Sequence, residues 1–233
     1  MGFVEAFWGG FSSFFSIWQI CASQISPFFM AFLAGFYFVG LSREGQGHYK
    51  RWVVVPCLSY IVGFSILYSL LSSPGLGIGR YLSYNLGAFR LLSGGYILFV
   101  SMYILFPDKI GIFKRLDGPF VLAGLSLILG VAFAVVYSPC ITPTLSKILG
   151  LVNDPRMAAR AATLALYYGA GLAAAFGATG LILVRLLGGA APVVMNLGRS
   201  RAACGLILGV LALLNITGFM TYYKAFVLGM LVK

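Results

Sequence analysis

Charged residues are scarce in this chain of 233 residues, of which they make up 9%, and only five are acidic. An average soluble domain is about one-quarter charged, so a soluble fold is excluded. No acidic residue lies well inside a long apolar run, which disfavours a carrier that couples transport to buried carboxylates. The five acids are Glu5, Glu44, Asp108, Asp117 and Asp154.

The chain also lacks the paired cysteines and histidines of metal sites. Its four cysteines form no C-x-x-C pair, and its one histidine, His48, lies in a polar stretch. This spacing disfavours a metal cluster and a disulfide-stapled secreted scaffold, and we expect neither a metal nor another cofactor. The missing C-x-x-C pairs also disfavour a quinone-linked disulfide oxidant.

Long apolar runs dominate the chain, which is 61% hydrophobic. Runs of about 20 residues or more indicate membrane-spanning helices, whereas membrane barrels show alternating segments of about ten residues. The sequence therefore predicts an all-α integral membrane protein of the plasma membrane with six spans. The expected spans cover residues 3–40, 52–71, 86–106, 119–152, 161–184 and 203–222.

Basic residues give the chain a formal net charge of +11, but they do not cluster. They are scattered between apolar runs, as in loops at a membrane surface, where anionic lipid is the partner. Nucleic-acid binding is therefore not expected. Nine Lys and Arg residues in the first, third and fifth loops predict that these loops are cytoplasmic and that both termini are extracytoplasmic. The nine are Arg43, Lys50, Arg51, Lys109, Lys114, Arg115, Arg185, Arg199 and Arg201.

The first and fourth apolar runs are much longer than one span requires, and each contains a central cysteine, Cys21 or Cys140. The two cysteines are 119 positions apart, and two ordinary spans follow each long run. This pattern predicts two three-helix repeats, 1–116 and 117–233, with broken first and fourth helices. An odd number of spans per repeat makes the repeats inverted, as in many transporters.

Cys140 lies between two prolines in the sequence Ser138-Pro139-Cys140-Ile141-Thr142-Pro143. Two prolines four positions apart remove two amide donors, so we expect the helix to break here. A half-helix beginning near either proline would direct its N-terminal amides at the sulfur and favour the thiolate, which is the nucleophilic form.

Cys21 has polar neighbours that are unusual at the centre of an apolar run, among them Gln24, and Pro27 follows six positions later. Polar groups at that depth are costly unless they are partnered or functional. We therefore expect a second helix break at the polar patch and Pro27. Cys57 and Cys204 lack such surroundings and are expected to be small apolar side chains.

The chain resembles the CcdA family, six-helix relatives of the electron-transporting membrane core of DsbD. Ser138-Pro139-Cys140-x-x-Pro143 closely matches the fourth-helix motif of the family, and Gly63-Phe64-Ser65 and Gly94-Gly95 are similar to family positions. The first-helix motif differs, because Gln19-Ile20 replace Ser-Pro and Gln24 replaces a proline. Pro27 keeps its expected offset from Cys21.

The resemblance implies transmembrane thiol–disulfide exchange. Cytoplasmic thioredoxin would reduce a Cys21–Cys140 disulfide, and the dithiol would then reduce an extracytoplasmic thioredoxin-like protein, for cytochrome c maturation or for general disulfide reduction. Such exchange needs two sulfurs that can approach to bonding distance and no cofactor. The alternative is a small-solute or metal-ion exporter in which the cysteines bind a soft cation.

Overall fold

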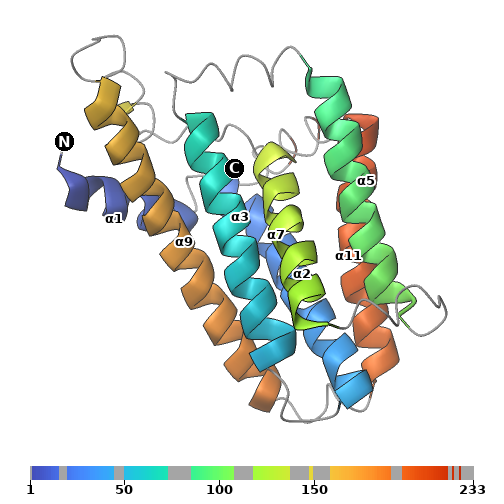
Figure 1. Cartoon of the computed structure of the whole chain (residues 1–233). Coiled ribbons are helices and arrows are strands. Elements are labelled where there is room, and N and C mark those ends of the chain that lie inside the picture. Colours follow the sequence, from blue (N-terminus) through green and yellow to red (C-terminus); the bar gives the residue numbers. More distant parts are fainter. Residues whose placement is uncertain are drawn as a thin grey trace.

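A computed structural model of the chain is helical throughout the secondary structure that it describes (Figure 1). The described residues are 2–15, 20–44, 50–72, 85–107, 118–136, 147–148, 158–189 and 196–219, with Tyr222 and Phe226. The helices are α1 (Phe3–Phe15), α2 (Ile20–Glu44), α3 (Val55–Ser72), α5 (Leu86–Leu105), α7 (Pro119–Val136), α9 (Ala158–Gly189) and α11 (Leu197–Thr217). A π-helical turn, η1 (Lys50–Val54), precedes α3. The all-α prediction is confirmed for these residues.

Within the described residues, four stretches are long and apolar enough to cross a membrane. They are Gly87–Leu105 in α5, Pro119–Val136 in α7, Ala159–Leu183 in α9 and Leu197–Thr217 in α11. A shorter apolar stretch, Trp52–Leu67, lies in η1 and α3. The chain is therefore built as a membrane protein, since a bundle of such helices satisfies its own backbone hydrogen bonds in lipid.

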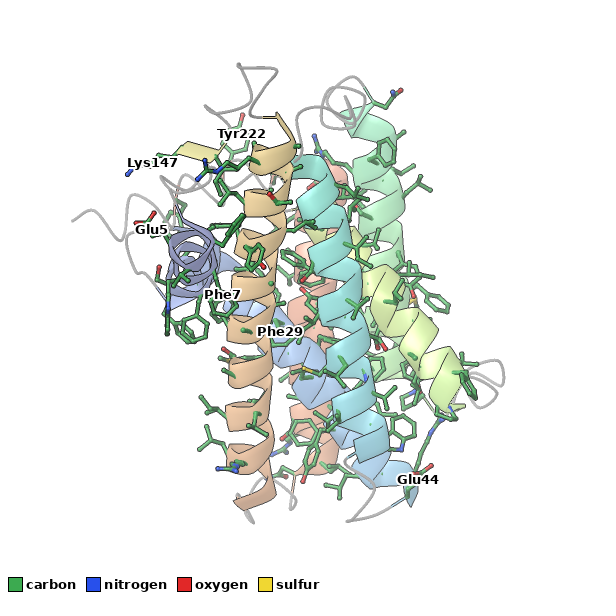
Figure 2. All side chains as sticks on the ribbon, turned by 60° about the vertical axis from the view of Figure 1, so that its left-hand side comes forward. Glu5, Phe7, Phe29, Glu44, Lys147 and Tyr222 are labelled. Carbon is green, nitrogen blue, oxygen red and sulfur yellow. The ribbon has the colours of Figure 1, made fainter. Side chains whose placement is uncertain are left out.

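Successive helices from α2 to α11 alternate in direction, as the colour gradient in Figure 1 shows. The ends of α2, α5 and α9 therefore lie at the same end of the bundle as the starts of α3, α7 and α11. The guanidinium of Arg43 donates a hydrogen bond of 2.6 Å to the Pro107 carbonyl and joins the ends of α2 and α5. We call this the Arg43 end and the opposite one the Arg90 end. Figure 2 labels Glu44 at the Arg43 end and Tyr222 at the other.

The core of the bundle is aromatic. Phe29 of α2, Tyr60 of α3 and Phe176 of α9 have 0% exposure, and their ring centroids are 4.9 to 5.8 Å apart. Figure 2 shows Phe29 inside the bundle. Further rings extend this cluster along α2, α3 and α7, namely Phe32, Phe36, Phe64 and Phe133. Edge-to-face and offset ring pairs of this kind add about 0.5–1.5 kcal/mol each beyond the area that they bury.

Among the described helices, the pairs α3·α7 and α1·α9 cross with a glycine directly against a carbonyl, and both crossings have the same arrangement. Where α3 crosses α7, the Tyr60 carbonyl lies against Gly130 and the Leu127 carbonyl lies against Gly63. A Cβ on either glycine would overlap the facing oxygen. Glycine permits this approach, which brings Cα hydrogens to carbonyl oxygens as in other closely packed membrane helices.

The second crossing joins α1 and α9. There the Tyr168 carbonyl lies against Gly10, and the Phe7 carbonyl lies against Gly171. In both crossings each glycine faces the carbonyl of a residue that precedes the partner glycine by three positions. Gly171 is therefore a helix-packing residue.

Pro27 does not break a helix, and that prediction is wrong. α2 continues through Pro27 from Ile20 to Glu44. The Pro27 side chain is exposed, and the following stretch is anchored by buried side chains such as Phe28, Phe29 and Phe32. Packing of neighbouring helices lets membrane helices retain an internal proline. The first apolar run contains the described helices α1 and α2, and the residues between them, 16–19, lie upstream of Pro27 and outside the described part. In Figure 2, α1 is seen along its axis while α3 and α9 stand upright.

The helices that contain the last two predicted spans extend further than predicted at the Arg43 end. α9 extends to Gly189 and α11 begins at Leu197, so Arg185, Arg199 and Arg201 lie in helices and not in a loop. Arg185 and Arg199 are exposed. Long cationic side chains at helix ends can extend to the membrane surface, which explains why they do not end the helices.

Candidate functional site

Cys21 is the second residue of α2 as the structure describes that helix, and residues 16–19, which separate α1 from α2, lie outside the described part. The first turn of a helix has backbone amides without an intrahelical acceptor and carries the positive end of the helix dipole. Gln24 follows in the same stretch of α2, and the side chains of both residues lie outside the described part of the structure. The sequence predicts a helix break at Pro27, but α2 is continuous there.

The second half of the predicted site is not among the described residues. α7 ends at Val136 as described. The structure does not describe residues 137–146, which include Ser138, Pro139, Cys140 and Pro143. The structure therefore locates the helix that leads to Cys140 but not the cysteine. The predicted pairing of Cys21 with Cys140 stays a prediction.

The backbone contacts nevertheless relate the two helices that lead to these cysteines. Gly10 and Phe7 of α1 are each 120 positions before Gly130 and Leu127 of α7, which make the same contacts. Tyr60 and Gly63 of α3 are each 108 positions before Tyr168 and Gly171 of α9. Cys21 and Cys140 are 119 positions apart, which differs by one from the offset between Gly10 and Gly130. Each cysteine therefore follows the glycine of its crossing at nearly the same distance along the chain.

The two other cysteines are packed in the bundle as free thiols. Cys57 on α3 is buried, and Cys204 on α11 is half-buried. A Cβ on Gly180 would lie 2.8 Å from the Cys57 sulfur, which shows how closely α9 packs on this thiol. This environment fits the expected role of Cys57 as a small apolar side chain.

The two equivalent tyrosines have different polar surroundings. The Tyr168 hydroxyl donates a hydrogen bond of 3.0 Å to the Ser13 hydroxyl, which in turn donates one of 2.7 Å to the Gly10 carbonyl. In the other crossing Phe133 occupies the position equivalent to Ser13. The Tyr60 hydroxyl is fully buried there and has no hydrogen-bond partner among the described residues.

A polar contact that the sequence analysis missed joins α5 and α11. The Asn215 side chain donates to the Arg90 carbonyl at 3.1 Å and to the Ser93 hydroxyl at 2.9 Å, and Arg90 Nε donates to the Asn215 carbonyl at 3.2 Å. The signal was available, since an arginine and an asparagine inside two apolar runs are costly unless they are partnered.

Within the described residues, no group of three His, Cys, Asp or Glu side chains could hold a metal ion. No protein-family model matches the chain, and neither a curated protein nor a solved structure shows significant similarity to it. The sequence motif around Cys140 and the geometry of the bundle are therefore the observations that bear on function.

Proposed function

We propose that this protein carries reducing equivalents across a membrane by thiol–disulfide exchange at Cys21 and Cys140. Cytoplasmic thioredoxin is the electron donor, and an extracytoplasmic thioredoxin-like protein is the acceptor. The protein acts as a thiol–disulfide oxidoreductase without a bound cofactor. The proline-flanked sequence Ser138-Pro139-Cys140-x-x-Pro143 is its most specific support.

The exchange consists of balanced two-electron steps. A thioredoxin thiolate attacks one sulfur of the Cys21–Cys140 disulfide, a mixed disulfide forms, and the other cysteine leaves as a thiolate that takes up a proton. The second thioredoxin thiol then displaces the bound cysteine, so thioredoxin leaves oxidised and the membrane pair is a dithiol. The same steps in reverse order reduce the acceptor on the other side.

The position of Cys21 is the structural observation that carries the proposal. It is the second residue of α2 as described, and α1 lies across the bundle whereas α2 runs along it (Figure 1). Unpaired amides at a helix start stabilise negative charge, and a thiolate inside a membrane bundle needs such stabilisation. A cysteine in the middle of an uninterrupted helix would not have it.

The equivalent crossings support a matching environment for Cys140. If α1 and α7 are the leading helices of two inverted repeats, the stretch after α7 corresponds to the stretch after α1. The offset of 120 positions that relates the glycines also relates Cys21 and Cys140 to within one residue. The six-span, inverted arrangement is part of this proposal, as are the plasma-membrane location and a cytoplasmic Arg43 end.

Trapping of a mixed disulfide tests the proposed function. Cys21→Ala and Cys140→Ala each leave one sulfur that cannot be released by its partner, so the complex with thioredoxin should persist under oxidising conditions. A thioredoxin variant without its resolving cysteine increases the yield. Non-reducing electrophoresis with mass spectrometry identifies the joined peptides.

The matched controls are Cys57→Ala and Cys204→Ala, each made alone and together. These variants retain the proposed pair and should support electron transfer at the wild-type rate. Absence of a thioredoxin adduct with both Cys21→Ala and Cys140→Ala would refute the proposed function. A thioredoxin adduct through Cys57 or Cys204 would show that the reactive cysteine is not Cys21 or Cys140.

A further inference from the structure

Arg90 is a cation within a helix that is apolar enough to span a membrane. It lies near the start of the stretch Gly87–Leu105 of α5, at the Arg90 end of the bundle. A charged residue inside a spanning helix is expensive, so it normally has a partner or a function. Neither α5 nor α11 contains an acidic residue, so its charge is not compensated from either helix.

The guanidinium is held in place by the end of α11. Its Nε donates to the Asn215 carbonyl, while the Asn215 side chain donates back to the Arg90 carbonyl. Gly218, which follows α11, has a φ of 85°, a backbone conformation that favours glycine. Its Cα lies against Nη2 of Arg90, so a Cβ at this position would overlap the guanidinium. Arg90 is therefore fixed at the C-terminal end of α11, where a cation is favourable.

This contact uses only one of the five N–H donors that a guanidinium carries. Among the described residues, no other hydrogen bond or ion pair involves the Arg90 side chain. The residue is half-buried, and neither of its Nη atoms is among the fully buried unpartnered atoms of the described residues. The Nη groups form the kind of planar fork that binds two oxygens of a phosphate group.

The neighbours of Arg90 indicate the depth of the headgroup region. Leu91 and Leu92 follow on α5 with 61% and 69% exposure, and such apolar surface suits acyl chains. Phe219 and Tyr222 lie just beyond α11, are exposed, and have ring centroids 5.7 Å apart. Exposed aromatic residues at helix ends are typical of the membrane–water interface.

We propose that Arg90 forms a binding site for the phosphate of an anionic phospholipid at the junction of α5 and α11. Asn215 and Gly218 hold the guanidinium, its free donors bind the phosphate, and Leu91 and Leu92 contact the acyl chains. Cationic pockets between membrane helices bind lipid headgroups in this manner. The site is independent of the thiol exchange, because no cysteine contributes to it.

Lipid binding by wild type, Arg90→Gln and Arg90→Lys tests the site. Native mass spectrometry of protein in mild detergent gives dissociation constants for phosphatidylglycerol and, for comparison, phosphatidylcholine. We expect Arg90→Gln to weaken phosphatidylglycerol binding by about tenfold or more, because a charge-assisted hydrogen bond is lost. The dissociation constant of Arg90→Lys should lie between those of wild type and Arg90→Gln, since lysine keeps the charge but lacks the planar pair of donors of a guanidinium.

Arg160→Gln is the matched control, because Arg160 is an exposed arginine in the first turn of another spanning helix at the same end. It should leave the tightest phosphatidylglycerol site unchanged. Equal losses for Arg90→Gln and Arg160→Gln would show a general charge effect and overturn the proposal. Displacement of the lipid by inorganic phosphate at comparable concentration would identify a free-anion site and would also overturn it.

Wild-type protein provides a test that does not depend on folding of the variants. Phosphatidylglycerol with a photoreactive group near its headgroup should crosslink mainly to the first turns of α5 and to the end of α11, as mapped by peptide mass spectrometry. Crosslinks distributed evenly over the helix ends would contradict the proposal.

Discussion

The backbone carbonyl of Tyr60 on α3 lies against Gly130 of α7, and the carbonyl of its counterpart Tyr168 on α9 lies in the same way against Gly10 of α1. This pair of equal contacts links two halves of a chain whose sequences are otherwise little alike. It also gives the helix before Cys21 and the helix before Cys140 equivalent packing contacts.

Gly63→Ala and Gly130→Ala should each destabilise the protein by about 1–3 kcal/mol, because the new methyl group overlaps a carbonyl and separates the helices. Thermal unfolding in detergent micelles measures the change. Gly124→Ala on α7 is the control, because nothing lies within 4 Å of a Cβ at that exposed position. A loss for Gly124→Ala as large as that for Gly130→Ala would show that the crossing is not the cause.

Gly10→Ala and Gly171→Ala should produce losses of the same size as Gly63→Ala and Gly130→Ala, because the second crossing has the same geometry. Gly95→Ala is the control here, since a Cβ there also meets nothing within 4 Å. Unaltered stability of both variants would mean that α1 does not pack on α9, and would remove the support for equivalent repeats.

Tyr168→Phe and Tyr60→Phe should have opposite consequences. Tyr168→Phe removes a buried hydrogen bond to Ser13 and should lower the free energy of unfolding by about 0.5–1.5 kcal/mol. Tyr60→Phe removes a buried hydroxyl that has no described partner, so the stability should stay the same or rise. The unfolding midpoints of the two variants, compared with that of wild type, test this prediction. A clear loss of stability for Tyr60→Phe would contradict it.

The two ends of the bundle should be labelled from different sides of the membrane. In a background without other reactive cysteines, Arg160→Cys should react with a membrane-impermeant maleimide added outside intact cells. Arg199→Cys should react only after permeabilisation, because the Arg43 end is proposed to be cytoplasmic. Labelling of both positions from outside would contradict the alternating topology, and a reversed result would contradict the orientation.

Hydrophobic patterning was sufficient to predict an all-helical membrane protein, since long apolar runs have few other stable structures in lipid. Local rules failed at Pro27, because packing around Phe28, Phe29 and Phe32 holds α2 together where proline chemistry predicts a break. Helix ends were misplaced at Arg199 and Arg201 for a related reason, since charge alone does not end a helix at a membrane surface.

The contacts between distant segments could be predicted only in part. The glycine-rich sequence of α9 suggests packing at Gly171, but it does not reveal that the Phe7 carbonyl is the contact. Arg90 and Asn215 are each conspicuous in an apolar run, yet their pairing depends on how α5 and α11 lie side by side. Such contacts are set by tertiary structure, which a pattern along one segment does not contain.

The state of the Cys21–Cys140 pair in a Cys57→Ala, Cys204→Ala background tests the central claim most directly. The protein is oxidised, then treated with reduced thioredoxin, and its free thiols are alkylated and counted by intact-mass spectrometry. The proposal predicts no alkylated thiol in the oxidised protein, a Cys21–Cys140 crosslinked peptide after proteolysis, and two alkylated thiols after thioredoxin treatment. Two alkylated thiols in the oxidised protein, or a disulfide that reduced thioredoxin leaves intact, would contradict it.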